Sequence, residues 1–549
     1  MSAKRALMSD GRSQWLLVLL LAVGLVALMS LPYWLATTTA RPGAFFTGII
    51  MNPEDSQTYF AKMRQGYDGQ WLYTIPFTAE AHEPAWVGVF YIWLGQAARA
   101  LGVSLTAVWH GTRSIAQFIL FLTTYWFVGA FTENGRERWT AYLLALFGSG
   151  LGWALFLFGQ TYWLDAFPVD FKQPGAHLFF TALTFPHITL GTALILCSVW
   201  GVWQLGQRPS WRLAVALGGA HLLLGIAYPF LIYLVAGVAA LLYLTWVWQR
   251  RRILWQTGWQ IATAFLIPLP MYAYFAYVLV SNDVFAAWDA QAATPSAPWP
   301  HYLVAYGPLL LLGAWHWWRR PLQRAAVTPL WVWALVVALL LYAPLPPQRR
   351  FVQGVHVPLS ILAALGFCRL LLPWLARQRP WQKLVQHPRY STTGLFTLLT
   401  AAFLFVMSLS NLYLLASVSV SAVIQQPDLL FRPDTEAEAA AWLRENGAET
   451  AVLLGDYQTG NYVAAQTGRR VVLGHWAETV AYEQKVADVA QFFAIATTDA
   501  WRQQYLADQR ITYVWHGPRE RALGGFDPQT AVYLRPIYRN AAITIYDLK

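Results

Sequence analysis

Charged residues are scarce in this chain of 549 residues, of which only 12% are Asp, Glu, Lys or Arg. A soluble protein carries about twice that share. Hydrophobic residues make up 57% of the chain, and the mean hydropathy is +0.38. They fall in runs of about 18 to 28 residues, long enough to cross roughly 30 Å of hydrocarbon as helix. This pattern excludes a soluble globular protein and predicts a polytopic α-helical membrane protein.

Cysteine is almost absent. Cys197 and Cys368 both lie inside apolar runs, with no further Cys or His at ligand spacing. A disulfide framework and a zinc site are therefore not expected. The chain also lacks an internal repeat and a nucleotide-binding glycine motif: the turn at 455–460 contains neither G-x-G-x-x-G nor G-K-[ST].

Positive charge is in excess, with a formal net charge of +11. Its distribution over short connections between apolar runs is typical of cytoplasmic loops and argues against nucleic acid as a partner. These connections hold Arg136 and Arg138, Arg208 and Arg212, Arg250 to Arg252, Arg319, Arg320 and Arg324, and the basic residues of 369–389. Placing them in the cytoplasm puts 38–83, 159–177, 281–300, 344–350 and everything after about 421 outside.

The first apolar run, about 15–35, follows Lys4, Arg5 and Arg12 and is longer than the core of a cleavable signal peptide. It predicts an uncleaved anchor with a cytoplasmic N-terminus in the plasma (inner) membrane. Segments 84–101 and 105–131 cannot both be full spans if the loop sides are right, so we expect 84–101 to be a half-span or an oblique helix. The prediction is a transmembrane domain over 1–425 with about 11 spans (range 10–13).

The tail, 426–549, differs in character. Thr435 and Glu438 form a capping-box pattern that opens a helix, and Gly447 closes it. Segments 451–454, 470–473, 511–515 and 542–546 read as short strands, with helical patterns between them, notably at about 478–497. We expect a small extracytoplasmic α/β domain.

An acidic pair stands at the expected outer mouth of the bundle, where Glu54 and Asp55 follow Pro53. A charge at the bilayer edge is kept where water or a protein partner meets it, which makes the pair a functional-site candidate; a solvated acidic loop is the alternative. A carboxylate placed there can accept a proton from an alcohol or amine. Two carboxylates can also hold Mg²⁺ or Mn²⁺, but no further ligand at suitable spacing is visible. No cofactor is assigned, and a divalent cation stays open.

This region resembles the GT-C superfamily of integral-membrane glycosyltransferases, most closely its Rgt- or mannosyltransferase-like branch. Asp55 and Tyr59 match an acidic D-E-x-x-Y-like motif of the first outer loop, and the sequence from His82 to Ala85 stands where an H-P-P-L-like motif would be. Two positions differ: Glu54 precedes Asp55 instead of following it, and Glu83 replaces a proline. The resemblance covers about residues 12 to 160 in detail and the rest as architecture.

The resemblance implies transfer of a sugar from a polyprenyl-phosphate donor to a lipid, glycan or protein acceptor on the outer face, usually with inversion. It assigns Asp55 as the general base and Glu54 to the orientation of the acceptor or a cation, although which carboxylate is the base stays open. Tyr59 and His82 are assigned to substrate binding.

A donor phosphate needs cationic partners, and Arg349 and Arg350 supply two guanidiniums in a connection placed outside. An outer Arg pair runs against the positive-inside bias; snorkelling to lipid headgroups is the alternative. We expect His356 to lie near the same helix face as Arg349 and to serve the same anion. His187, within an apolar run, is either a cavity residue or a structural histidine.

Two other functions compete with the transferase. A transporter or lipid flippase would show ionisable residues near mid-span and a two-fold hydropathy repeat, neither of which is clear here. A non-catalytic membrane scaffold on a GT-C-like fold is the third hypothesis. Membrane lipids are expected partners in each case.

Overall fold

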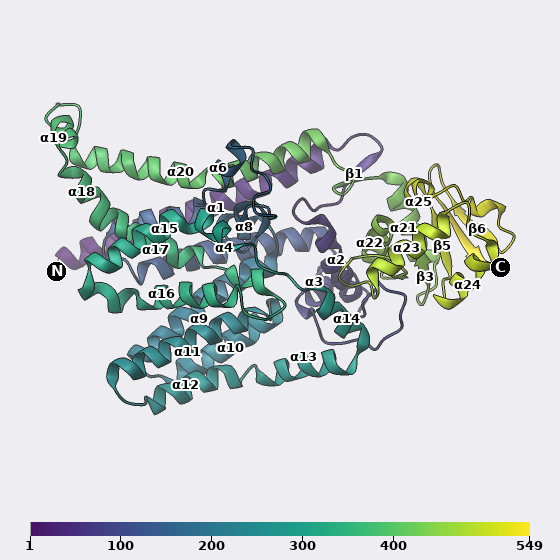
Figure 1. Ribbon diagram of the computed structural model, residues 1–549, viewed down its shortest axis with the longest axis horizontal. Coiled ribbons are helices and arrows are strands. Elements are labelled where there is room, and N and C mark those ends of the chain that lie inside the picture. The colour runs from purple at the N-terminus through teal and green to yellow at the C-terminus, as the bar shows by residue number, and fades with distance from the viewer. Residues whose placement is uncertain (1) are drawn as a thin grey trace. The chain divides into compact units, whose positions relative to one another are not determined.

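The computed structural model describes residues 2–549, with side chains from Ser13 onward, so Lys4, Arg5 and Arg12 lie outside the described side chains. The described residues group into two compact units (Figure 1). The helical unit comprises the chain up to Ser30, Thr112–Tyr272 and Thr294–Ser417. The mixed unit comprises Leu31–Gly111, Ala273–Ala293 and Val418–Lys549.

Apolar sequence builds the helical unit, because a helix satisfies its own backbone hydrogen bonds where water is absent. Its longer helices are α5 (Gly135–Phe147), α9 (Pro186–Gln207), α10 (Trp211–Ala227), α11 (Leu231–Arg250), α12 (Trp255–Leu266), α15 (Trp299–Arg319), α16 (Arg324–Leu340) and α17 (His356–Gly366). Four further helices are shared with the mixed unit: α1 (Ser2–Thr39), α4 (Leu105–Gly129), α13 (Leu269–Ser281) and α20 (Thr392–Val420). Shorter helical pieces are α6 (Gly152–Leu157), α7 (Val169–Lys172), α8 (Leu178–Leu183), η2 (Gln348–Val352), η3 (Phe367–Leu371), α18 (Leu372–Ala376) and α19 (Arg379–Val385).

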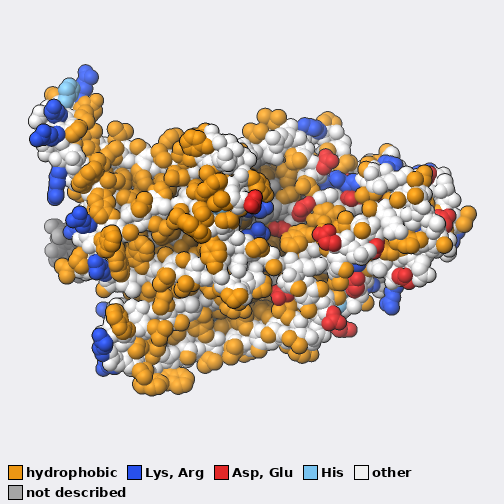
Figure 2. Space-filling model, viewed as in Figure 1, with side chains coloured by type: hydrophobic (Ala, Val, Ile, Leu, Met, Phe, Trp, Pro, Cys, Tyr) orange, Lys and Arg blue, Asp and Glu red, His pale blue; other side chains and the backbone are white. Residues whose placement is uncertain are grey.

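Apolar helices of membrane-spanning length are present, as expected. Of the described helices, six are long and apolar enough to span a bilayer, and the bent pair α12–α13 would make a seventh. Figure 2 shows hydrophobic side chains covering the flank of this unit. Two apolar runs that the sequence suggests are single spans are interrupted: the run 139–158 divides into α5 and α6, and the run 178–204 into α8 and α9. The chain is an integral membrane protein, and the count of about eleven spans stays a prediction.

Arginines of the basic connections form hydrogen bonds that join the ends of neighbouring helices. The Arg250 guanidinium donates to the carbonyl of Gly206 at 2.8 Å, which joins the ends of α11 and α9. Arg369 donates at 2.7 Å to Glu137 and at 2.7 Å to Gln323, joining η3, the start of α5 and the α15–α16 connection. Figure 2 shows Lys and Arg gathered at the end of this unit that carries α18 and α19. That this side is cytoplasmic stays a prediction.

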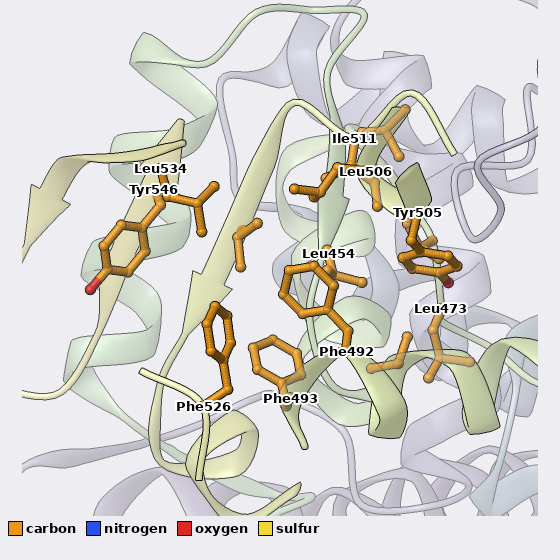
Figure 3. Close-up of a cluster of buried hydrophobic side chains, with 14 of the residues drawn as sticks. Leu454, Leu473, Phe492, Phe493, Tyr505, Leu506, Ile511, Phe526, Leu534 and Tyr546 are labelled. Carbon is orange, nitrogen blue, oxygen red and sulfur yellow. The ribbon is translucent and has the colours of Figure 1, made fainter. Parts of the chain in front are cut away.

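The tail folds as an α/β layer with the strand order β4-β3-β5-β7-β6. The central strand β3 (Val452–Leu454) pairs in parallel with β4 (Arg470–Val471) and β5 (Tyr513–His516). Strand β7 (Thr544–Leu548) pairs antiparallel with β5 and with β6 (Leu534–Arg539). Connecting helices are α21 (Asp434–Asn446), α22 (Tyr457–Thr467), α23 (Tyr482–Phe493), α24 (Asp499–Asp508) and α25 (Pro518–Leu523). Leu454, Phe492 and Phe493 lie at the centre of the buried core (Figure 3).

Most tail elements confirm the sequence prediction, but the short strand β2 (Phe431–Pro433) was not predicted, and three further points differ. Strand β6 was missed because most of its residues are exposed or half-buried and it holds Pro536, as edge strands do. The capping-box prediction was wrong because Pro433 occupies the N-cap, and no side chain caps α21. The helix expected at about 478–497 begins only at Tyr482, because a turn formed on the carbonyl of His475 comes first.

The first loop belongs to the mixed unit, together with α2 (Pro53–Tyr67), α3 (Val89–Leu101) and α14 (Asp283–Gln291). Its strand β1 (Ala44–Phe46) pairs antiparallel with β2 (Phe431–Pro433). Further along, the N–H of Val471 donates to the carbonyl of Pro76 at 2.9 Å, and Ala79 joins the core of the tail. Residues of the first loop therefore complete the α/β layer. The domain boundary at 425/426 stays a prediction.

Candidate functional site

Helix α2 presents the acidic pair in its first turn. Asn52 precedes the helix with a left-handed backbone (φ 46°), and Pro53 occupies the first turn, where its missing N–H costs no hydrogen bond. Glu54 and Asp55 follow in the same turn, next to the positive end of the helix dipole. The local sequence thus places two carboxylates beside the free N–H groups of the first helical turn.

Each carboxylate has its own partner in the tail. His475 Nε2 lies 3.1 Å from Asp55 Oδ1, and Gln458 Nε2 donates to Glu54 Oε1 at 2.7 Å. The Asp55 side chain is 46% exposed, whereas that of His475 is only 7% exposed. A buried imidazole therefore orients a carboxylate that stays open to solvent, which is the arrangement a general base needs.

A second set of contacts fixes helix α2 to the tail two turns after the acidic pair. Lys62 Nζ lies 2.9 Å from Glu478 Oε1 in a buried ion pair, and 4.0 Å from the centre of the Tyr73 ring. The Tyr73 hydroxyl donates to the other oxygen of Glu478. Burial lowers the pKa of Lys62 against the attraction of Glu478, and it raises the pKa of Tyr73. Because Glu478 is three residues from His475, one turn of the tail fixes α2 and orients Asp55.

Tyr59 lies one helical turn beyond Asp55, so the two share a face of α2. Its ring stacks on Tyr91 with centroids 4.4 Å apart and lies 6.2 Å from Trp109. Phe60 stacks on the same tryptophan at 5.2 Å. Tyr59 is the half-buried end of an aromatic stack, which gives the site an apolar wall.

His82 organises the loop after α2. Its Nε2 accepts the N–H of Ile75 at 2.9 Å, and its Nδ1 lies 3.0 Å from the carbonyl of Glu80. Burial lowers the pKa of His82. Burial opposes ionisation of Glu80, but Lys485, with its Nζ 2.7 Å away, holds the pKa of this carboxyl below its usual value. Both ring nitrogens of His82 therefore serve the loop itself.

In the helical unit, the two arginines gather around Tyr228. Arg350 lies over the ring of Phe230, 4.8 Å from its centre, and both Arg349 and Arg350 interact electrostatically with Tyr228. The ring of His187 lies 5.2 Å from that of Tyr228. The structure thus places His187, whose role was left open between a cavity residue and a structural histidine, beside the same tyrosine as the two arginines proposed for donor binding.

His356 has other neighbours. The expectation that it shares a helix face with Arg349 was wrong, because Gly354 (φ 76°) separates η2 from α17. His356 begins α17 fully buried, with its ring 4.8 Å from that of His177. His177 lies 3.4 Å from Asp170, which accepts hydrogen bonds from the N–H of Gly152 and the hydroxyl of Ser410. This buried cluster has no counterpart among the residues predicted from the sequence.

The residues that complete the acidic site were not predicted from the sequence either. They are Gln458, Lys62, His475 and Glu478. His475 and Glu478 are polar residues next to a predicted strand end, which is a weak signal on its own. Their partners are 420 and 416 positions away, beyond the reach of any local pattern.

No metal site emerges from the part of the chain that the structure describes, because it holds no group of three or more His, Cys, Asp or Glu placed to share an ion. Glu54 and Asp55 already have Gln458 and His475 as hydrogen-bond partners. Binding of a divalent cation at the acidic pair stays an open expectation.

No protein-family model and no curated protein matches the sequence. Several solved structures are similar to this chain. ArnT from Cupriavidus metallidurans in the apo state is 12% identical, with 98% of each chain covered and a TM-score of 0.52. The same protein bound to undecaprenyl phosphate is 13% identical, with 95% of this chain and 97% of that chain covered and a TM-score of 0.50. The arabinofuranosyltransferase AftD from Mycobacteria is 14% identical over 95% of this chain and 40% of its own length, with a TM-score of 0.51. These likenesses show a shared fold.

Proposed function

We propose that this chain, which has the fold of the GT-C glycosyltransferases, moves a sugar from a polyprenyl-phosphate donor to an acceptor outside the cytoplasm. The observation that carries the proposal is Asp55, half exposed at the start of α2 and oriented by the buried His475. Support for the donor class comes from the similar structure described with undecaprenyl phosphate. The plasma membrane, a cytoplasmic N-terminus and an extracytoplasmic mixed unit are parts of the proposal.

Asp55 acts as the general base. Its carboxylate takes the proton of the acceptor hydroxyl as that oxygen attacks the anomeric carbon, while the bond from that carbon to the donor's phosphate oxygen breaks on the opposite face. This displacement inverts the anomeric centre. His475 holds the Asp55 rotamer, and Glu54, held by Gln458, orients the acceptor.

Arg349 and Arg350 bind the donor phosphate and stabilise the charge that develops on it as the leaving group departs. His187 stands beside Tyr228 in the same cluster and contributes to donor binding. Tyr59 supplies an aromatic wall next to the base. His82 and His356 contribute through the elements they hold, the loop after α2 and the start of α17.

No step of the proposed reaction involves a metal ion. Whether Mg²⁺ or Mn²⁺ adds to the rate is measured by removing divalent cations with EDTA and restoring each in turn.

The test of the base is Asp55→Asn in protein reconstituted with polyprenyl-phosphate sugars. Transfer should fall by at least about 100-fold, because the amide cannot take the proton. The matched control is Glu54→Gln, which also removes one negative charge from the same turn and should cost less than about tenfold. If Glu54→Gln abolishes transfer and Asp55→Asn does not, Glu54 is the base.

The donor site is tested by Arg349→Ala combined with Arg350→Ala. Losing two charge-assisted contacts should weaken binding of the polyprenyl-phosphate sugar roughly 10- to 100-fold. Arg324→Ala, at the first residue of α16, serves as the control. Equal donor affinity in the double variant would return both arginines to a headgroup role.

A further inference from the structure

A cleft of about 780 Å³ lies within the mixed unit, on another side of α2 from the acidic pair. Strand β1, the second half of α2, the start of α4 and helices α21 and α22 contribute to its lining. Asp55 and Arg64 are nine residues apart on α2, which puts them on opposite faces and about 14 Å apart along the axis. The cleft is therefore separate from the proposed catalytic carboxylate.

Positive charge dominates this cleft. Arg64 and Arg444 line it, and its one carboxylate, Asp68, also interacts with Arg99 and Arg469. Arg64 is only 12% exposed, its nearest contact with Asp68 is 4.0 Å, and its Nε has no hydrogen-bond partner among the described residues. Arg444 also lies 3.7 Å from Glu445, and Arg469 donates to the carbonyls of Arg444 and Gly447. The cationic donors that the cleft itself offers to an oxyanion are therefore those of Arg64 and Arg444.

The walls are aromatic rather than aliphatic. The described lining has five aromatic rings and two aliphatic side chains, Val103 and Leu105. Phe45 and Tyr462 face each other with centroids 6.4 Å apart. The hydroxyl of Thr106 and the amide of Gln466 add hydrogen-bonding groups. Flat rings beside such groups fit a sugar, which has an apolar C–H face and a polar edge, better than they fit an acyl chain.

We propose that this cleft binds a saccharide that carries a phosphate or carboxylate group. The anion lies between Arg64 and Arg444, and the sugar ring packs on the aromatic wall. The cleft is a second carbohydrate-binding site, and its occupancy does not depend on transfer at Asp55. No bond is made or broken there.

The experiment measures binding of glucose 6-phosphate to the full-length protein in detergent micelles. Arg444 is 41% exposed, so Arg444→Gln should fold, and its dissociation constant should rise by about tenfold or more. The matched control is Arg535→Gln, a 61% exposed arginine elsewhere on the unit, which should bind as the unaltered protein does. A second variant, Val103→Trp, fills the cleft from its exposed rim without changing charge and should also weaken binding.

Asp55→Asn separates this site from the proposed transferase, since it should leave the binding of glucose 6-phosphate unchanged. The proposal is overturned if Arg444→Gln and Val103→Trp both bind with unaltered affinity. It is also overturned if inorganic phosphate binds as tightly as glucose 6-phosphate, which would mean an anion site without sugar recognition. Displacement of the probe by an equal concentration of short-chain phosphatidylglycerol would instead assign the cleft to lipid.

Discussion

At the residue scale, His82 shows how one side chain fixes the shape of a loop. It joins the carbonyl of Glu80 to the N–H of Ile75 through its two ring nitrogens. Only the neutral imidazole can do both, because the protonated ring has no acceptor nitrogen. The loop therefore depends on the protonation state of one histidine.

This dependence predicts a change in stability between pH 7.5 and pH 5.5. Burial lowers the pKa of His82 below its usual value of about 6.5, so the unfolded chain binds the proton first. Stability should therefore fall as the pH drops below about 6.5. Hydrogen exchange of residues 74–83 should accelerate over this range, and His82→Gln should flatten the response. An identical pH response in both proteins would contradict the assignment. The Glu80 carboxyl, whose pKa is lowered, acts only at lower pH.

The sequence alone could single out the pair Glu54 and Asp55, because two carboxylates after a proline, close to the end of an apolar run, are a local pattern. It could not identify the histidine that orients Asp55, because His475 lies 420 positions away. The same limit applied to His356, where one glycine with positive φ broke the helix on which the prediction rested.

At the element scale, helices α2 and α3 touch through their backbones. A Cβ on Gly66 would stand 2.0 Å from the carbonyl oxygen of Ile92, and one on Gly95 would stand 1.9 Å from that of Met63. Both positions must therefore be glycine, because any side chain there would collide with the backbone of the facing helix. The apolar pattern predicted an element at 84–101, but only the contact explains why it is a short helix packed on α2 and not a span.

Gly66→Ala should therefore force α2 away from α3, at a cost of about 1–3 kcal/mol or more. Because Asp55 and Lys62 lie on α2, the proposed transfer should fall with stability. The control is Gly111→Ala in α4, where a Cβ would meet nothing within 4 Å and helix propensity favours alanine by about 1 kcal/mol. Thermal melting and transfer rate measure both effects. Equal melting temperatures for the two variants would contradict the packing argument.

At the scale of the whole molecule, the apolar runs predicted the helical unit, and the change of composition after 425 predicted the α/β layer. What could not be predicted is that segments 31–111 and 273–293 fold with the tail. The reason is physical: buried Glu478 and Lys485 find their partners in Lys62 and Glu80, on a segment about 400 residues earlier.

Residues 426–549 expressed alone should therefore be markedly less stable than in the full chain. Leaving a buried charge without its partner costs about 3–5 kcal/mol. The double variant Glu478→Gln with Lys485→Met removes both charges and should recover part of the loss in the isolated segment. Calorimetry of the isolated segment and of its double variant measures the two melting temperatures. If the isolated tail melts cooperatively at the same temperature as its double variant, the prediction is refuted.

The pairing of β1 with β2 has a consequence for biosynthesis. The ribosome makes Ala44–Phe46 near the beginning and Phe431–Pro433 near the end, so the first strand waits, unmatched, through almost the whole of translation. Asp55 likewise has no His475 to contact during this time, so a nascent chain cut short before residue 475 would lack the side chain that orients this carboxylate.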